Sequence, residues 1–136
     1  MRVISGNFRG TRLDAVSGDK TRPTTDKVKE AMFSMLMPYL DEGEVLDLYA
    51  GTGGLSIEAV SRGMTHATLV DRQYQAIKIM TDNVKKTHHE NQFTILKLPA
   101  QQALSKFDTE NKQFDLVFLD TPYAKETIAS DMAKMV

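Results

Sequence analysis

The first residues that could carry chemistry form a glycine turn between an apolar run and a helical pattern. Residues 45–58 read VLDLYAGTGGLSIE, so the glycines of residues 51–54 follow a buried strand that ends near Asp47. Such glycines let a ligand approach the backbone where a side chain would clash. A dinucleotide fingerprint needs a third glycine where this chain has Ser56. The turn therefore indicates a nucleotide-binding site, but its glycine spacing matches the pyrophosphate-binding pattern only in part.

A carboxylate follows the glycine turn at the distance typical of a ribose-binding acid. Asp71 lies 20 residues after Gly51, at the end of a second apolar run, where it can accept both hydroxyls of an adenosyl ribose. Asp47 adds negative charge that would repel a pyrophosphate but suits the ammonium group of a bound amino acid. The pair favours S-adenosylmethionine over NAD. The residues predicted to bind this cofactor are Asp47, Tyr49, Gly51, Thr52, Gly53, Gly54, Asp71, Arg72 and Ala100.

A second motif follows the last apolar run, which covers residues 114–119. The exocyclic amine of a base has its lone pair delocalised into the ring, and hydrogen bonds to a carboxylate and a carbonyl can orient it toward a methyl donor. Asp120 can supply the carboxylate. Thr121 can supply the carbonyl, because Pro122 fixes the backbone and leaves that carbonyl available. Tyr123 can stack on a flipped base, so residues 120–123 are predicted to hold a methyl acceptor.

Basic residues gather ahead of both motifs. Residues 1–22 have a local excess of three positive charges, which could contact phosphates of a nucleic acid. An ordinary solvated hairpin is the alternative interpretation. The basic residues of this segment are Arg2, Arg9, Arg12, Lys20 and Arg22.

The elements that must position these residues alternate between strand and helix. Such alternation predicts a Rossmann-like α/β fold, a mostly parallel sheet with helices on both faces. Right-handed crossovers place the carboxyl ends of all strands on one edge, so Asp47, Gly51, Asp71 and Asp120 should converge there. The predicted strands cover 45–49, 68–70, 93–97 and 114–119, and the predicted helices cover about 55–62, 74–86 and 101–107.

Two further elements are predicted before the first central strand. Short β-like pieces at 2–5 and 11–13 flank a glycine-containing turn, which indicates a small N-terminal β-hairpin. Pro23 precedes Thr24 and Thr25, either of which can cap a helix. The apolar face predicted for this helix consists of Val28, Ala31, Met32, Met35, Leu36 and Tyr39.

The composition limits the class of protein. At 136 residues the chain is long enough for one domain with a core. Its 17 basic and 18 acidic residues nearly cancel, so a nucleic-acid surface must come from local clustering. The absence of cysteine excludes a disulfide framework and Cys-ligated metals. No signal peptide or membrane-spanning apolar run is visible, so we expect a cytoplasmic protein without membrane contact. We also expect a monomer without a metal site.

The chain resembles a known family across nearly its whole length. The resemblance begins at residues 2–6 and 9–10, passes through TRPTTDKVKEAMF at 21–33 and the glycine turn, and ends at 120–123. It is similar to the class I S-adenosylmethionine-dependent methyltransferases, and within them to the bacterial RsmD family of 16S rRNA guanine-N2 methyltransferases. The resemblance implies methyl transfer to the 2-amino group of a guanine in small-subunit rRNA, naked or within an assembling ribosomal particle. It also implies that the hairpin, Arg22 and Thr24 lie near the RNA.

The chain departs from the family pattern at three places. Thr121 stands where the family has the first proline of Asp-Pro-Pro-Tyr, and Pro99 stands where many members carry an acid that meets the adenine amine. A hydrogen bond to adenine must then come from the neighbouring backbone or Gln101. Family members also continue beyond the catalytic turn. We therefore predict a basic hairpin over 1–22 and a C-terminally incomplete methyltransferase domain over 23–136.

Alternative functions use the same residues. An adenine-N6 methyltransferase acting on DNA or RNA would use the same catalytic turn. The second alternative is not an enzyme: it is a non-catalytic fragment that binds the cofactor or RNA. An NAD-linked oxidoreductase is disfavoured by Ser56.

Overall fold

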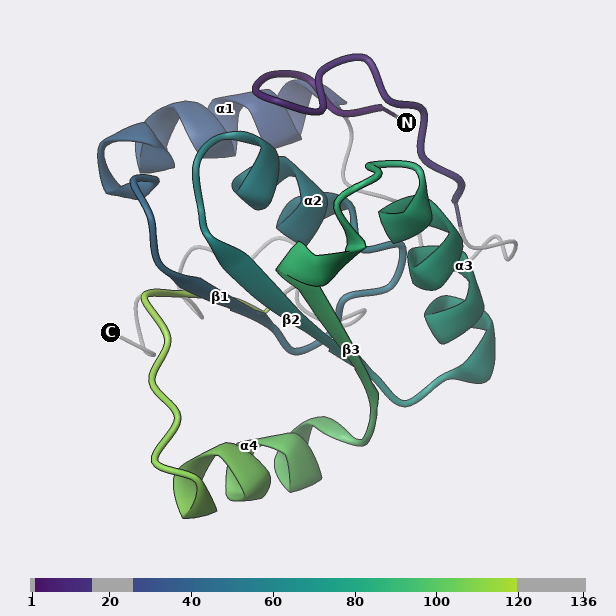
Figure 1. The fold of residues 1–136 in the computed structure, drawn as a ribbon, viewed down its shortest axis with the longest axis vertical. Helices are drawn as coiled ribbons and strands as arrows, with labels where there is room; N and C mark the ends of the chain where they lie inside the picture. Colours follow the sequence, from purple (N-terminus) through teal and green to yellow (C-terminus); the bar gives the residue numbers. More distant parts are fainter. Residues whose placement is uncertain (1, 16–25, 120–136) are drawn as a thin grey trace.

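In the part of the chain that the structure describes, four parallel strands form the central sheet (Figure 1). The structure is a computed structural model that describes residues 2–15 and 26–119. The strand order is β3-β2-β1-β4, and every neighbouring pair is parallel. The four predicted strands are confirmed, with β2 longer and β4 shorter than expected. Their bounds are β1 Glu44–Asp47, β2 His66–Asp71, β3 Phe93–Lys97 and β4 Leu116–Phe118.

Helices cover both faces of the sheet, as the sequence predicts. Successive strand residues point to opposite faces, so Val45 and Leu69 join one apolar cluster while Leu46 and Val70 join the other. In Figure 1, α1, α2 and α3 lie on one face and α4 lies on the other. The fold is therefore the predicted Rossmann-like α/β arrangement. The helices span α1 Asp26–Leu36, α2 Gly54–Ser61, α3 Tyr74–Lys85 and α4 Ala100–Thr109, and short 3-10 turns cover Met37–Tyr39 and Glu90–Gln92.

The apolar face predicted for the first helix is wrong at several positions. Met32 and Leu36 of α1 pack against the core. Ala31 is exposed, and the large apolar residues Val28, Met35 and Tyr39 are 57%, 75% and 75% exposed. The residues that α1 buries most completely are instead Lys29 and Phe33.

The contacts beneath α1 explain why it buries the face that carries Lys29 and Phe33. The Phe33 ring packs against the Phe118 ring at 5.9 Å between centroids and lies 5.1 Å from the Arg62 guanidinium carbon. Lys29 is only 1% exposed, and its Nζ lies 3.3 Å from Oε1 of Glu58. A charged residue therefore occupies a core-facing position because a buried carboxylate meets it.

Glu58 of α2 is the centre of a buried polar cluster. Its side chain is fully buried, and its Oε2 accepts a hydrogen bond of 2.7 Å from Nε of Arg62. The backbone N–H groups of Ile4 and Ser5 donate to its two oxygens at 2.9 and 3.1 Å. One carboxylate thus joins α1, α2 and the start of the chain, since Lys29 is also its ion-pair partner.

The N-terminal arm, residues 2–15, reverses direction as the hairpin prediction requires. It forms one antiparallel bridge between Arg2 and Arg12 and no longer strand pair within the described residues. The Val3 N–H donates to the Thr11 carbonyl, and the Gly10 N–H donates to the Val3 carbonyl, both at 2.9 Å. Figure 1 shows the arm lying across the helices of one face. The boundary predicted at residue 22 lies outside the described residues and stays a prediction.

Glu58→Gln should destabilise the protein strongly. The substitution leaves Lys29 and Arg62 buried without their counter-charge, which costs about 3 to 5 kcal/mol in the free energy of unfolding. Urea denaturation measures this loss.

A matched control removes an exposed partner instead. Glu110→Gln breaks the Lys106–Glu110 pair, whose side chains are about half exposed, and should cost at most about 1 kcal/mol. Equal losses for the two variants would contradict the role given to Glu58.

Candidate functional site

The glycine loop, residues 48–53, lies at the carboxyl edge of the sheet. The Leu48 N–H donates to the Phe118 carbonyl at 3.2 Å, and the Ala50 N–H donates to the Val70 carbonyl at 3.0 Å. The loop is therefore held between the ends of β4 and β2. Gly51 and Gly53 adopt left-handed φ values of 56° and 80°, which glycine adopts without steric cost.

The two left-handed glycines face different surroundings. A Cβ at Gly53 would lie 2.9 Å from Cδ2 of Leu69 and 3.3 Å from Cβ of Met80, so Gly53 packs against the core. A Cβ at Gly51 would meet no atom within 4 Å among the described parts of the chain. Among the described residues the backbone at Gly51 is thus uncovered, so a ligand that a side chain would exclude could approach it.

Asp71 meets the glycine loop directly. Its Oδ2 accepts a hydrogen bond of 3.0 Å from the Gly51 N–H, and its Oδ1 accepts one of 2.9 Å from the Gln73 N–H. Each carboxylate oxygen can accept more than one hydrogen bond. Asp71 can therefore hold the loop and still accept ribose hydroxyls. Arg72, the next residue, is exposed.

Asp47 lies beneath the loop. It is only 1% exposed, and its Oδ2 accepts a hydrogen bond of 2.8 Å from the hydroxyl of Ser56, which is fully buried. Ser56 stands where a dinucleotide fingerprint has its third glycine. Its hydroxyl thus orients a carboxylate under the loop, a role that the sequence did not indicate.

The remaining predicted cofactor residues lie at the same edge. The Leu98 N–H donates to the Asp71 carbonyl at 3.2 Å, which brings the start of α4 at Ala100 beside β2. Tyr49 is 39% exposed on the loop. Thr52 and Gly54 complete the turn, and the Thr52 hydroxyl accepts a hydrogen bond of 3.2 Å from the Gly54 N–H.

Asn83 of α3 is a site residue that the sequence analysis missed. It is fully buried, and its Nδ2 donates to the Thr52 carbonyl of the glycine loop at 2.9 Å. The same amide also bonds the backbone of Asp14 in the N-terminal arm. A signal was present, because Asn83 falls among the core-facing residues of α3, where a polar group needs partners.

The predicted RNA-contacting and catalytic residues are only partly described. Arg2, Arg9 and Arg12 are exposed on the N-terminal arm. Arg22, Thr24 and the predicted catalytic residues Asp120, Thr121, Pro122 and Tyr123 lie outside the described residues. In the sheet, Phe118 of β4 is the register partner of Asp47. The described part of β4 thus runs to the edge that carries the glycine loop.

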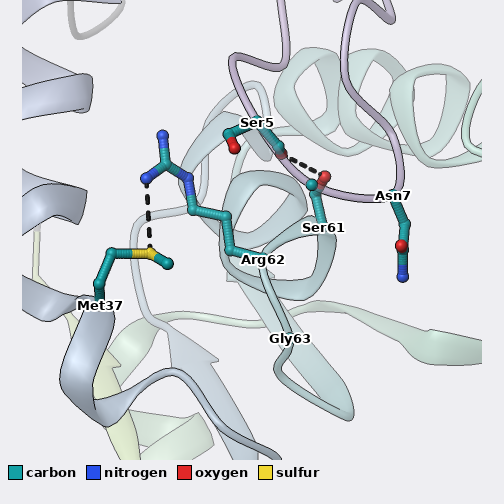
Figure 2. Close-up of a pocket in the computed structure, with 7 residues that line it drawn as sticks. Ser5, Asn7, Met37, Ser61, Arg62 and Gly63 are labelled. Atoms are coloured by element: carbon teal, nitrogen blue, oxygen red, sulfur yellow. Dashed lines mark hydrogen bonds between the residues drawn. The ribbon is translucent and has the colours of Figure 1, made fainter.

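A pocket of about 260 Å³ lies at the other end of α2 (Figure 2). In this pocket the Ser61 hydroxyl donates to the Ser5 carbonyl at 2.6 Å, and the Arg62 guanidinium donates to Sδ of Met37 at 3.7 Å. The first contact joins the arm to α2, and the second joins the end of α2 to the 3-10 turn at Met37–Tyr39. The lining residues, which include none of the predicted site residues, are Ser5, Gly6, Asn7, Met37, Ser61, Arg62 and Gly63.

Residues 2–15 and 26–119 contain neither a membrane-spanning helix nor a metal-binding cluster. No helix there is long and apolar enough to span a membrane. In the same ranges, no cluster of three or more His, Cys, Asp or Glu residues is arranged to hold a metal ion.

Comparisons with known sequences point to one family. The sequence pattern of the family described as "Conserved hypothetical protein 95" matches residues 1–136. The chain is 45% identical over 128 residues to "Putative rRNA methyltransferase YlbH" of Bacillus subtilis, covering 94% of this chain and 70% of that protein. It is 33% identical over 121 residues to "Ribosomal RNA small subunit methyltransferase D" of Buchnera aphidicola, covering 89% and 62%. The Escherichia coli K12 protein of that name is 30% identical over 125 residues, covering 92% and 61%. The chain thus spans 61 to 70% of the length of these relatives.

Solved structures show the same similarity. "Putative methyltransferase yhhF" from Escherichia coli superposes with a TM-score of 0.74 at 28% identity, covering 90% of this chain and 64% of that one. A hypothetical protein from Thermus thermophilus gives a TM-score of 0.78 at 26% identity, covering 97% and 79%. The predicted fold is therefore found among methyltransferases.

Gly53→Ala should destabilise the protein more than Gly51→Ala. Both variants incur the left-handed backbone cost of about 1 to 2 kcal/mol. Only the first also forces a methyl group into Leu69 and Met80, which adds about 1 to 3 kcal/mol. Thermal unfolding of the two variants compares the losses, and an equal decrease in Tm would show that Gly53 is not packed as described.

Proposed function

Because the chain belongs to the family described as "Conserved hypothetical protein 95", we propose that it is an rRNA methyltransferase. It transfers a methyl group from S-adenosylmethionine to the exocyclic 2-amino group of a guanine in small-subunit rRNA. The observation that carries the proposal is the glycine loop, whose Gly51 N–H is bonded to Asp71 while its outer side is open. Relatives named as methyltransferases of small-subunit rRNA support the substrate class.

The cofactor-binding edge fits S-adenosylmethionine in three respects. Asp71 has lone pairs left for ribose hydroxyls. The open backbone at Gly51 admits a ligand that a side chain would exclude. Ala100, which opens α4 beside Asp71, lies on the side proposed for adenine, where Pro99 leaves recognition to backbone groups and Gln101. When bound, the cofactor supplies a methyl group on a sulfonium.

Asp47 is only 1% exposed, and its Oδ2 is already bonded to the Ser56 hydroxyl. Direct binding of the ammonium group, which the sequence suggests for Asp47, stays a prediction. We propose that Asp47 fixes the loop through Ser56 and supplies negative potential beneath the methionine part of the cofactor.

In this proposal, the residues that follow β4 orient the guanine that accepts the methyl group. The Asp120 carboxylate and the Thr121 carbonyl accept hydrogen bonds from the guanine amine, and Tyr123 stacks on the base. A bound cofactor would supply the methyl group, whose bond to the sulfonium sulfur would break as the bond to the amine nitrogen forms. S-adenosylhomocysteine would leave, and the methylated amine would release its proton to solvent. Pro122 restricts the backbone of the turn. RNA phosphates contact the arm through Arg2, Arg9 and Arg12, together with Arg22 and Thr24.

Labelled methyl transfer to small-subunit rRNA tests the reaction. The substrate is rRNA that lacks the modification, offered naked and within partly assembled particles, and nucleoside mass spectrometry identifies the product. We expect N2-methylguanosine. N6-methyladenosine would assign the chain to the alternative substrate, and cofactor binding without any product would identify a non-catalytic fragment.

Asp120→Ala should separate catalysis from cofactor binding. Losing the group that orients the amine should lower the methyl-transfer rate by about 100-fold or more, with the affinity for S-adenosylhomocysteine nearly unchanged. Asp108→Ala is the control, because Asp108 is an exposed carboxylate on α4 away from the proposed site. An Asp120→Ala variant as active as this control would rule out the proposed role.

Asp71→Asn should weaken binding of S-adenosylhomocysteine. Hydrogen bonds to a charged acceptor contribute about 1.5 to 3 kcal/mol, so the Kd should rise by roughly 10-fold to 100-fold. A 2′,3′-dideoxy analogue distinguishes direct contact from an effect on the loop. Asp71→Asn should cost this analogue less affinity, and an equal loss for both ligands would refute the ribose assignment.

A further inference from the structure

The N-terminal arm and the glycine loop meet at one buried amide. Nδ2 of Asn83 donates to the carbonyls of Asp14 and Thr52, both at 2.9 Å. Its Oδ1 accepts a hydrogen bond of 2.7 Å from the Asp14 N–H. Asp14 is 69 residues from Asn83 in the chain, and Thr52 is 31 residues from it. The side chain of Asn83 therefore connects the arm to the loop through direct hydrogen bonds.

The other end of the arm is fixed to α2. Glu58 accepts the backbone N–H groups of Ile4 and Ser5, and Ser61 accepts the Phe8 N–H at 2.9 Å through its hydroxyl. The Asn7 N–H donates to the Ser61 carbonyl at 2.8 Å. The arm thus spans the two helices that flank the glycine loop, because α2 begins directly after the loop and α3 carries Asn83.

The bond to Thr52 fixes a peptide next to the open part of the loop. The Thr52 carbonyl belongs to the peptide that links Thr52 to Gly53, and the Gly53 N–H of that peptide donates to the Ala50 carbonyl at 2.8 Å. Rotation of this peptide would break the Gly53–Ala50 hydrogen bond, which closes the turn that contains Gly51. Undocking of the arm would remove the Asp14 partners of the Asn83 amide. Because a buried amide without partners is unfavourable, Asn83 would then be held less firmly in the position from which it bonds Thr52.

We propose that Asn83 is a positioning residue that makes the cofactor affinity of the glycine loop depend on the docked N-terminal arm. This inference rests on the proposed function, which places S-adenosylmethionine at the loop. Because coupling between two binding events is reciprocal, cofactor binding also stabilises the docked arm. RNA that binds the docked arm through Arg2, Arg9 and Arg12 then raises the affinity for the cofactor.

Titration calorimetry with S-adenosylhomocysteine as the probe tests the coupling. Asn83→Ala should raise the Kd by roughly 10-fold or more, within the usual range of coupling between sites. Asp14→Ala should leave it nearly unchanged, because Asp14 offers Asn83 only backbone atoms, and the exposed ion pair of its side chain with Lys86 contributes little to docking. Val84→Ala is the stability control, since Val84 is a buried residue of the same helix. It should lower Tm without changing the Kd.

The outcomes separate the inference from the proposed function. An Asn83→Ala variant that is folded and binds as tightly as Asp14→Ala would overturn the inference. A loss of affinity in Val84→Ala equal to that in Asn83→Ala would also overturn it, because helix destabilisation would then explain both. An unaltered chain that does not bind the probe would overturn the proposed function and the inference with it.

Hydrogen exchange on the unaltered protein covers the case in which Asn83→Ala does not fold. The probe should slow exchange at the loop amides of Gly51 and Gly53. It should also slow exchange at the arm amides of Val3, Gly10 and Asp14, which are bonded to the Thr11 carbonyl, the Val3 carbonyl and Asn83. Slower exchange in the loop with no change in the arm would overturn the inference and leave the proposed function standing.

Discussion

The described structure depends on one fully buried carboxylate. Glu58 accepts hydrogen bonds from Ile4, Ser5 and Arg62 and pairs with Lys29. Moving α2 away from this arrangement would leave charges in the protein interior without a partner, which is strongly unfavourable. The position of α2, the docking of the N-terminal arm and the face that α1 buries are therefore set together. Since α2 begins at the glycine loop, the same cluster also fixes where that loop stands.

The central fold could be predicted from the sequence because it is determined by local patterns. Apolar runs, helical spacing and their alternation give the parallel sheet and the helices on both of its faces. The apolar face of α1 could not be predicted in this way. Periodicity counts Val28 and Met35 as buried and Lys29 as exposed, whereas the structure has the reverse. The deciding partner of Lys29 is Glu58, which is distant in the sequence.

The candidate site also combines residues that local patterns predict with residues that only distant contacts determine. Gly51, Gly53 and Asp71 were found because residue type and spacing indicate a nucleotide turn, and the structure brings Asp71 to Gly51. The role of Ser56 toward Asp47 and the bonds of Asn83 depend on contacts across the fold, which no local pattern contains. The catalytic residues Asp120 to Tyr123 stay a prediction, because they lie outside the described residues.

The glycine loop is restrained on three sides. Asp71 holds the Gly51 N–H, Asn83 holds the Thr52 carbonyl, and Gly53 packs against Leu69. Such a loop is preorganised, so a ligand that settles on it orders few additional dihedral angles and loses little conformational entropy. While the arm is docked, the proposed cofactor would therefore meet a preformed surface, at an association rate set by diffusion and orientation without a folding step.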